Sequence, residues 1–300
     1  MEKETRKVTT RIITNYSPSD DAITEIVHCG NVTEIKVLER NPLNNLGKCK
    51  RKSKDLYVNT ETGEVLEYKH NEKSGNKRNM NKAFEKLRYL INNNFKSDIN
   101  ELHVILTYAE KMDDFDKASK DFKRFWEKVN YKYPDLEYIR IIEPQHTGTW
   151  HIHVLIKTAK KGYFTLPKDE LEQLWGHGYV WISKIKNNDN VGAYFSACLK
   201  DVDVFEKDSE NPNDTKCIVK GARLRFYPHN KRFYSYSKGI KKPLTIRTTY
   251  GEAKKNYDLE DCVYKKAQEI VLKPDDESEK EKVVNRVLRL QLNSKRKKKS

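Results

Sequence analysis

The sequence predicts an α+β fold, in which helices pack on one face of a central antiparallel sheet of about five strands. Between residues 102 and 236, short apolar runs of strand length alternate with longer stretches whose apolar residues recur at helical spacing. The resulting order is β-α-β-β-α-β-α-β. Pro144, Pro167 and Gly176 stand where the pattern expects elements to begin or end.

The segments before this region are less regular in pattern. Residues 1–80 are polar and are expected to form a basic, irregular N-terminal extension, with a small hairpin at 55–65. A helix is expected over 81–92 because apolar residues recur there on one stripe. The stripe consists of Phe84, Leu87, Leu90 and Ile91.

In the central region, the periodicity places each element in turn. Strands are expected at 102–108, 137–143, 151–157 and 179–182, helices at 114–130, 167–176 and 190–200, and a last strand within 223–236. The helix at 114–130 is amphipathic, so one of its faces should be buried. That face consists of Phe115, Ala118, Phe122, Phe125, Trp126 and Val129.

The pattern divides the chain into a main domain at 81–243 and two extensions, at 1–80 and 244–300. The C-terminal extension is expected to hold a helix and a basic tail at 295–299. The apolar side of that helix would consist of Val283, Val284, Val287 and Leu288.

The composition favours a polyanionic partner. The chain has 59 Lys and Arg residues against 44 Asp and Glu, which gives a formal net charge of +15. A protein this basic usually binds nucleic acid. No apolar run reaches the ~18–20 residues needed to span a membrane, and no secretion signal is recognised. The 5 cysteines include no Cys-x-x-Cys pair, which argues against a disulfide framework or a zinc finger. We therefore expect a cytoplasmic protein without a membrane partner.

The strongest chemical signal is His151-Ile152-His153, two histidines separated by one apolar residue. In a strand, side chains two residues apart point to the same face, so both imidazoles would leave one side of the sheet. Two imidazoles with a carboxylate nearby make a good site for a divalent metal.

A carboxylate is expected to join the histidines across a hairpin. The segment 137–143 reads as the preceding strand, and a turn between the two strands would place Glu143 opposite His151. The patch would then offer two nitrogens and one oxygen to a metal. If the hairpin is not symmetric, His146 or Gln145 competes with Glu143 as the third ligand.

A candidate nucleophile lies on the helix expected at 190–200. Tyr194 stands there, some forty residues after the paired histidines. A phenol is a poor nucleophile in water because its pKa is about 10, but a metal that binds the phosphate under attack would stabilise the developing charge. A tyrosine on a rigid helix facing that metal could attack a phosphodiester and form a covalent phosphotyrosine.

Together these segments resemble the three-motif signature of HUH endonucleases, the family of rolling-circle replication initiators (Rep proteins) and conjugative relaxases. The motifs are Val104-Ile105-Leu106-Thr107-Tyr108, then Glu143 with His151-Ile152-His153, then Val191-Gly192-Ala193-Tyr194. Each motif alone is weak, but the three in this order form a specific signal. The likeness is to Rep proteins of rolling-circle plasmids and integrative elements of Gram-positive bacteria, and it covers about residues 55–243.

The resemblance implies an HUH-type catalytic domain and a role for each motif residue. His151, His153 and Glu143 would bind Mg²⁺ or Mn²⁺. Tyr194 would nick one DNA strand at a replication origin and stay joined to the 5′-phosphate, leaving a 3′-hydroxyl for a host polymerase. Reversal of the same chemistry would close the circle without ATP.

The sequence departs from the family pattern at two places. Many Reps carry a second tyrosine four residues after the first, where this chain has Cys198, which implies a one-tyrosine mechanism. The lysine usually found three or four residues after the tyrosine is also absent. Lys200 is the candidate for its role, and Lys184 or Lys186 could supply the charge instead.

The resemblance also predicts partners: single-stranded and origin DNA, with a host polymerase. No Gly-x-x-x-x-Gly-Lys-Ser/Thr loop is present, so unwinding is expected to need a host helicase. Nothing in the sequence specifies an oligomeric state. The alternatives are a relaxase or transposase with the same chemistry, a phosphodiesterase that uses a bound water, and a non-catalytic nucleic-acid-binding module.

Overall fold

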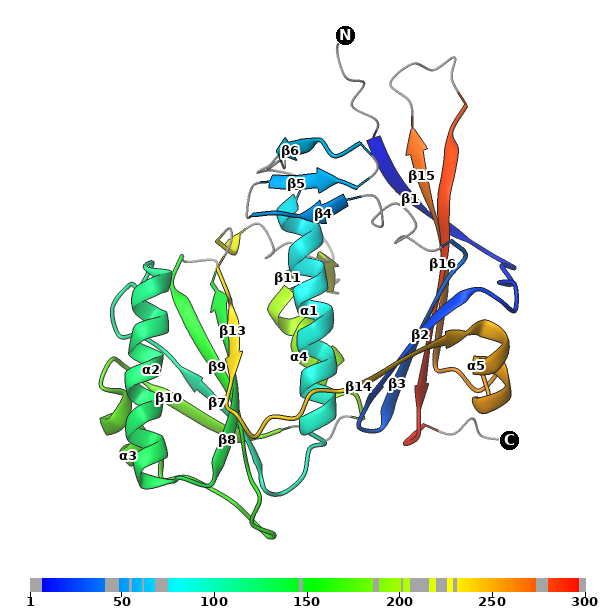
Figure 1. Cartoon of the computed structure of the whole chain (residues 1–300). Helices are drawn as coiled ribbons and strands as arrows, with labels where there is room; N and C mark the ends of the chain where they lie inside the picture. Colours follow the sequence, from blue (N-terminus) through cyan, green and yellow to red (C-terminus); the bar gives the residue numbers. More distant parts are fainter. Residues whose placement is uncertain are drawn as a thin grey trace, which may run out of the picture. The chain divides into compact units, whose positions relative to one another are not determined.

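The computed structural model describes residues 7–40, 49–53, 56–60, 62–67, 75–145, 148–185, 189–200, 202–205, 216–219, 226–228, 231–273 and 280–296. The chain divides into two compact units (Figure 1). Unit 1 comprises Met1–His28, Val32–Lys73 and Leu244–Ser300, and unit 2 comprises Cys29–Asn31 and Ser74–Pro243. Within the described ranges, no helix is both long and apolar enough to cross a membrane.

Unit 2 is built on the antiparallel five-stranded sheet that the sequence predicts, in the order β10-β7-β9-β8-β13. Its strands are β7 (Glu101–Leu106), β8 (Leu136–Pro144), β9 (Trp150–Thr158), β10 (Val180–Lys184) and β13 (Tyr234–Tyr236). The central strands β7 and β9 carry apolar side chains on both faces, so the sheet must be covered on both sides.

Four helices cover this sheet: α1 (Gly75–Asn94), α2 (Phe115–Lys132), α3 (Lys168–Trp175) and α4 (Val191–Lys200). Helix α2 begins where the Asp114 carboxylate accepts hydrogen bonds from the amides of Asp116 and Lys117, an N-cap. Its buried face contains all six predicted apolar residues, and also Asp121. Helix α3 ends at Gly176, whose φ of 69° suits a left-handed C-cap.

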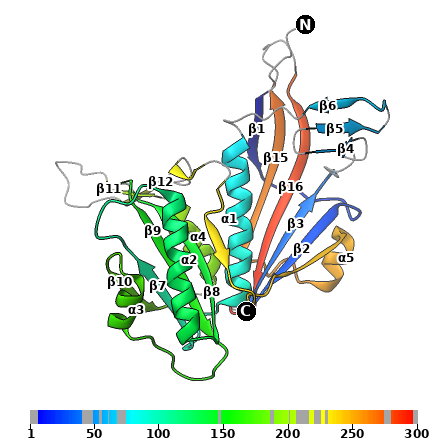
Figure 2. The same cartoon turned by 60° about the vertical axis from the view of Figure 1, so that its left-hand side comes forward.

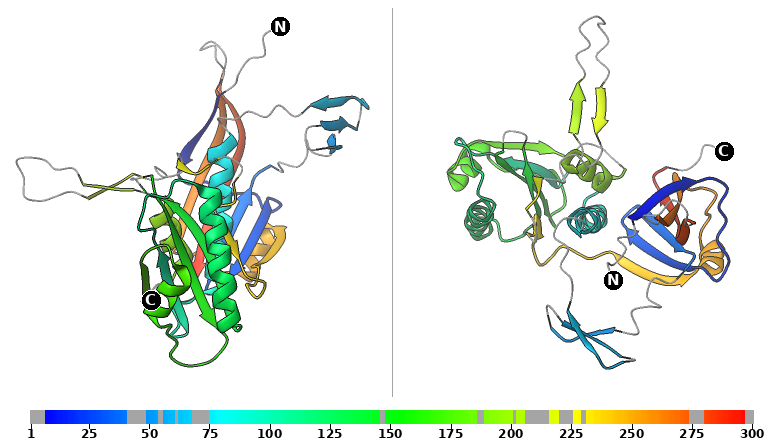
Figure 3. Two further views of the ribbon diagram at one scale, coloured as in Figure 1. Left: turned by 90° about the vertical axis from the view of Figure 1, so that its left-hand side faces the viewer. Right: turned by 90° about the horizontal axis from the view of Figure 1, so that it is seen from above.

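The expectation that the helices share one face of the sheet was wrong. The Phe122 and Trp126 rings of α2 pack on Tyr138 of β8, whereas Phe195 of α4 packs on His103 of β7. The strand register puts Tyr138 and His103 on opposite faces. In Figure 3 (right), the sheet stands between the α2–α3 pair and the α1–α4 pair.

Unit 1 is a second antiparallel sheet to which both ends of the chain contribute, in the order β1-β15-β16-β3-β2-β14 (Figure 2). Its elements are β1 (Lys7–Ile13), β2 (Ile23–Cys29), β3 (Val32–Leu38), β14 (Leu244–Thr249), α5 (Tyr250–Asn256), β15 (Tyr264–Lys273) and β16 (Lys282–Asn293). The N-terminal extension is therefore not irregular, because its strands share a sheet with the C-terminal ones.

The expected C-terminal helix was also wrong, since Val283, Val284, Val287 and Leu288 lie in strand β16. Their spacing imitates a helical stripe. The residues of β16 in the core cluster are Leu288 and Leu290, which follow the two-residue period of a strand. The β-branched valines favour that conformation.

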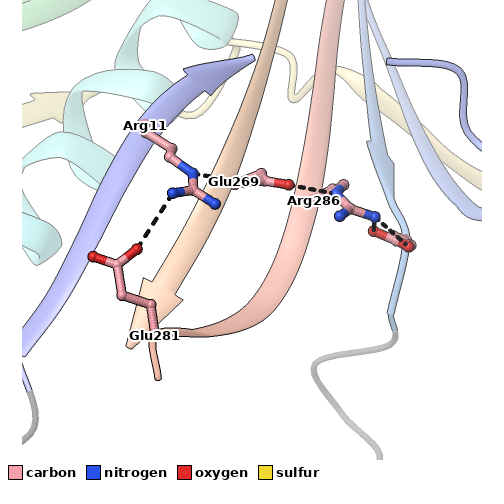
Figure 4. A network of polar contacts seen from close by, with 5 residues as sticks. Arg11, Glu269, Glu281 and Arg286 are labelled. Atoms are coloured by element: carbon pink, nitrogen blue, oxygen red, sulfur yellow. Dashed lines mark hydrogen bonds and ion pairs between the residues drawn. The ribbon is translucent and has the colours of Figure 1, made fainter. Parts of the chain in front are cut away.

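A row of alternating charges crosses strands β1, β15 and β16 of unit 1 and ends at Glu39, the residue after β3 (Figure 4). Arg11 lies opposite Glu269, which lies opposite Arg286. The Glu269 carboxylate accepts a hydrogen bond of 2.7 Å from the Nε of each arginine. Arg286 also contacts Glu39, at 3.2 Å. Directly opposed, opposite charges of this kind stabilise a sheet.

Two smaller sheets complete the described elements. The predicted hairpin at 55–65 corresponds to β5 (Leu56–Asn59) and β6 (Val65–Glu67), joined by β4 (Cys49–Arg51). Strands β11 (Val202–Phe205) and β12 (Lys216–Val219) pair with each other. Most of the predicted basic tail, from 297 onwards, lies outside the described residues.

Candidate active site

The predicted hairpin between the two motif strands is present, and Glu143 of β8 lies opposite His151 of β9. The turn is held by hydrogen bonds from the Gln145 amide to the Thr149 carbonyl and from the Gly148 amide to the Gln145 carbonyl, each 3.0 Å. Gly148 has a φ of 79°, which favours glycine. The register places Glu143 and both motif histidines on one face of the sheet.

The carboxylate of Glu143 reaches past its register partner to the second histidine. Its Oε2 lies 2.5 Å from Nε2 of His153. Nδ1 of His151 instead lies 2.7 Å from the side-chain amide of Gln145. Glu143 is buried, with 5% of its surface exposed, so its charge depends on these protein partners rather than on water.

A third histidine, which the sequence analysis missed, completes the cluster. Nε2 of His103, on β7, lies 3.0 Å from Nδ1 of His153. The two rings are stacked, with centroids 5.3 Å apart. The available signal was a single imidazole inside the otherwise apolar run Leu102–Leu106, on the strand that pairs with β9.

Burial keeps all three imidazoles uncharged at neutral pH. It lowers the pKa of His153 to about 4. Burial and then the neighbouring His153 ring lower the pKa of His151 to about 4 and that of His103 to about 3. The neutral imidazole is the form that binds a metal.

The donor atoms are chemically suited to a divalent ion, but they do not converge on one point. In the part of the chain that the structure describes, no three His, Cys, Asp or Glu side chains form a group able to hold a metal. The donors are engaged with other side chains instead: Glu143 with His153, and His151 with Gln145. A metal bound by Glu143, His151 and His153 therefore requires two changes: the direct contact between Glu143 and His153 must open, and His151 must leave Gln145.

Helix α4, which carries Tyr194, is fixed at its start by a buried pair of amides. Nδ2 of Asn92, on α1, donates to Oδ1 of Asn190 at 2.9 Å, and Asn190 Oδ1 also accepts from the Ala193 amide at 3.0 Å. The Gly192 amide donates to Oδ1 of Asn92 at 2.6 Å. A Cβ at Gly192 would lie 2.3 Å from a backbone oxygen of α1, so only glycine allows this approach.

Aromatic contacts connect Tyr194 to the histidines. The Tyr194 ring meets Phe195 edge to face, with centroids 5.4 Å apart. Phe195 meets His103 in the same way at 4.8 Å, and His103 stacks on His153. Tyr194 itself is 37% exposed. The helix of the candidate nucleophile thus packs on the same face as the paired histidines.

The structure describes only some of the side chains expected to assist Tyr194 or to complete the metal site. Lys184 lies opposite Leu102, on the face away from His103, and its ammonium bonds the carbonyls of Ile99 and Phe164. It is therefore wrong as a substitute lysine beside Tyr194. His146, Lys186 and the side chains of Cys198 and Lys200 lie outside the described residues, so their predicted roles stay predictions.

A family model described as a replication-associated protein, of the ORF2 type, matches residues 101–202. No curated protein and no solved structure matches the chain. The matched segment begins at β7 and continues past the end of α4, so it contains the histidine cluster and Tyr194. It is about a third of the chain. Over this segment the chain is similar to replication-associated proteins, which supports a role in the initiation of replication.

Proposed function

We propose that this protein nicks and rejoins one strand of DNA at a replication origin, and so initiates rolling-circle replication of a plasmid or mobile element. The observation that supports it most is the hairpin of β8 and β9. It gathers Glu143, His151 and His153 on the face where the Tyr194 helix packs, inside the segment similar to replication-associated proteins.

Glu143, His151 and His153 would hold Mg²⁺ or Mn²⁺. The carboxylate suits both ions, and the two histidines would add neutral nitrogen donors to it. When bound, the metal would polarise the phosphate under attack and neutralise its developing charge. The buried position of Glu143 favours this role, because a carboxylate shielded from water interacts strongly with a cation.

Tyr194 is the proposed nucleophile. Its phenol would lose a proton as Oη attacks the phosphorus of the scissile phosphodiester. The bond from phosphorus to the 3′-oxygen would break, and that oxygen would take up a proton to become a 3′-hydroxyl. The 5′-phosphate would remain on Tyr194, and the reverse reaction would restore the phosphodiester. Lys200, six residues after Tyr194, is proposed to assist by its charge.

The proposed substrate is single-stranded DNA at the origin. The net charge of +15 favours binding to a polyanion, and a host helicase and polymerase would supply unwinding and synthesis. A relaxase or transposase would use the same nicking chemistry on another DNA site.

A nicking assay tests the proposal. A random-sequence single-stranded DNA library, labelled at its 3′ end, is incubated with the protein in Mn²⁺ or in EDTA and run on a denaturing gel. We expect the 3′ label on a protein band only in Mn²⁺, because the downstream fragment stays on the tyrosine. A parallel reaction labelled at the 5′ end should release fragments that a polymerase extends.

Three variants identify the residues. Tyr194→Phe and His151→Ala should lose the covalent band, whereas Tyr179→Phe should keep it. Tyr179 is a matched control because it lies in the same segment and is 73% exposed. Cleavage without a covalent band would point to a water nucleophile, and DNA binding without cleavage would point to a non-catalytic module. Either result contradicts the proposal.

A further inference from the structure

His103 is a polar residue in an otherwise apolar strand, and none of the three motifs contains it. Its register partner on β9 is Leu155, two residues after His153. Since side chains two residues apart share a face, the His103 ring lies on the same face as His153. It approaches that ring from the side opposite to Glu143, because it meets Nδ1 whereas Glu143 meets Nε2.

The contact between the two imidazoles fixes where protons can be. A neutral imidazole has one N–H donor and one acceptor nitrogen. With Nε2 of His103 3.0 Å from Nδ1 of His153, one of these nitrogens must carry a proton and the other must not. The proton on His153 is therefore coupled to the tautomer of His103.

This coupling matters for the metal site on which the proposed function rests. Only Nε2 of His153 faces Glu143, so a cation shared by these two residues must bind Nε2. The single proton of a neutral His153 must then sit on Nδ1, and it needs an acceptor. Metal-binding histidines generally donate their second N–H to such an acceptor, which orients the ring. Nε2 of His103 is in position to be that acceptor.

We propose that His103 is a positioning residue: it accepts a hydrogen bond from Nδ1 of His153 and so presents Nε2 of His153 to the metal. The two ring planes are only 11° apart, so the N–H of one ring can point at the in-plane lone pair of the other. The same imidazole contacts Phe195, next to Tyr194. His103 therefore supports the ligand on one side and the helix of the nucleophile on the other.

Two substitutions at this position separate hydrogen bonding from packing. His103→Phe keeps an aromatic ring to stack on His153 and Phe195 but removes both ring nitrogens. His103→Gln keeps an acceptor oxygen near the place of Nε2 but removes the ring. His28→Phe is the matched control, because His28 lies in unit 1 and its ring nitrogens bond Thr33 and Tyr257.

The readout is the affinity of the full chain for Mn²⁺ alone, measured by calorimetry, with thermal unfolding to confirm that each variant is folded. We expect His103→Phe to weaken Mn²⁺ binding by about 10- to 100-fold, the usual effect of losing the partner of a ligating histidine. His103→Gln should stay within about 3-fold of wild type on the same reasoning, and His28→Phe should be unchanged.

The opposite pattern would overturn the inference. Tight binding by His103→Phe, with or without loss in His103→Gln, would mean that the ring acts only by packing. Loss in both variants would mean that an acceptor is not sufficient. Wild-type protein that binds no Mn²⁺ would instead overturn the metal-dependent function, and the role of His103 with it. Failure of the inference alone leaves wild-type binding intact.

Discussion

Unit 1 and unit 2 each bury a carboxylate, but its partners differ. In unit 1, Glu269 lies between Arg11 and Arg286, and all three side chains are satisfied by opposite charge. In unit 2, the buried carboxylate of Glu143 meets the ring of His153, which burial keeps neutral. In unit 1, the charges of the row are paired with one another within the protein. In unit 2, the ring nitrogens and carboxylate oxygens could exchange their present partners for a metal ion.

This difference distinguishes residues that stabilise the fold from residues that could bind a ligand. A row of alternating charges across strands adds cross-strand attraction and has no further use for a ligand. Neutral imidazoles beside a carboxylate are costly to bury but are suited to a cation. The proposed reactive site therefore lies in unit 2, and we assign a structural role to the charged row of unit 1.

The largest effect is expected from Gly192→Ala. The new Cβ would lie 2.3 Å from the Arg88 carbonyl oxygen and 2.9 Å from Oδ1 of Asn92, so α4 must move away from α1. A displacement of about 1 Å at a reacting group can cost about 100-fold in rate, and overpacking costs about 1–3 kcal/mol. We expect the rate of covalent band formation to fall by about 100-fold. The control is Ala197→Ser, at an exposed position of the same helix, which should react at the wild-type rate. A wild-type rate in Gly192→Ala would contradict the prediction, because it would mean that α4 does not position Tyr194.

Mild acid should destabilise unit 2. Between pH 6.5 and about 4, the unfolded chain binds protons that the buried His151 and His153 do not bind, because their pKa values are lowered to about 4. Stability therefore falls as the pH falls through this window, by about 3 kcal/mol for one such histidine. All four tryptophans lie in Ser74–Pro243, so tryptophan fluorescence during urea unfolding reports on unit 2.

Unit 1 should resist the same acid. Hydrogen bonds from Arg286 and Arg11 lower the pKa of Glu269, so its contribution is present above the ordinary carboxyl pKa of 4.5 and is lost only below it. Hydrogen exchange of β15 and β16 amides at pH 6.5 and 4 would measure the stability of unit 1.

For unit 2, the measured quantity is the urea concentration at the midpoint of unfolding, followed by tryptophan fluorescence. A midpoint that does not change between pH 6.5 and 4 would contradict the burial of neutral histidines.

Arg140→Met should stabilise unit 2 slightly. Arg140 is 5% exposed, and burial lowers its pKa to about 10. In the described part of unit 2, its Nε has no hydrogen-bond partner, and its guanidinium lies 5.2 Å from the Phe122 ring centroid. Replacing a buried charge by an apolar side chain is often stabilising, so we expect a gain of about 1 kcal/mol after the ring contact is lost. Lys123→Met is the control, because Lys123 is an exposed residue of α2 whose ion-pair partner, Glu127, is also exposed. A loss of stability above about 1 kcal/mol in Arg140→Met would show that the guanidinium is well paired.

Glu269→Gln is expected to have the smallest effect. It removes the charge between two arginines, but Arg286 keeps Glu39 and Arg11 keeps Glu281 as partners. Faster hydrogen exchange in β15 and β16 is the expected result, with Mn²⁺ binding and DNA cleavage unchanged. A loss of cleavage in this variant would break the division between the two units.

Much of unit 2 could be predicted from the sequence because its signals are local. Helix α2 has a clear apolar stripe and an aspartate cap, and the hairpin register followed from the spacing of Glu143 and His151. Unit 1 could not be predicted in this way, because β1 and β15 pair across some 260 residues and neither carries information about the other. The valines of β16 also fit a helical stripe as well as a strand.

The placement of the candidate site residues could be predicted only within single motifs. His151, His153 and Glu143 are close in sequence, so one hairpin brings them together. His103 comes from β7, and Asn92 from α1. Their relation to the motifs depends on strand order and helix packing, which no local pattern specifies.

The amino acid that becomes joined to DNA can be identified chemically. Protein reacted with single-stranded DNA and Mn²⁺ would be digested with nuclease and protease, and its peptides analysed by mass spectrometry. We expect a nucleotide attached through its 5′-phosphate to Tyr194. A nucleotide on another residue, or DNA cleavage that leaves no peptide modified, would contradict it.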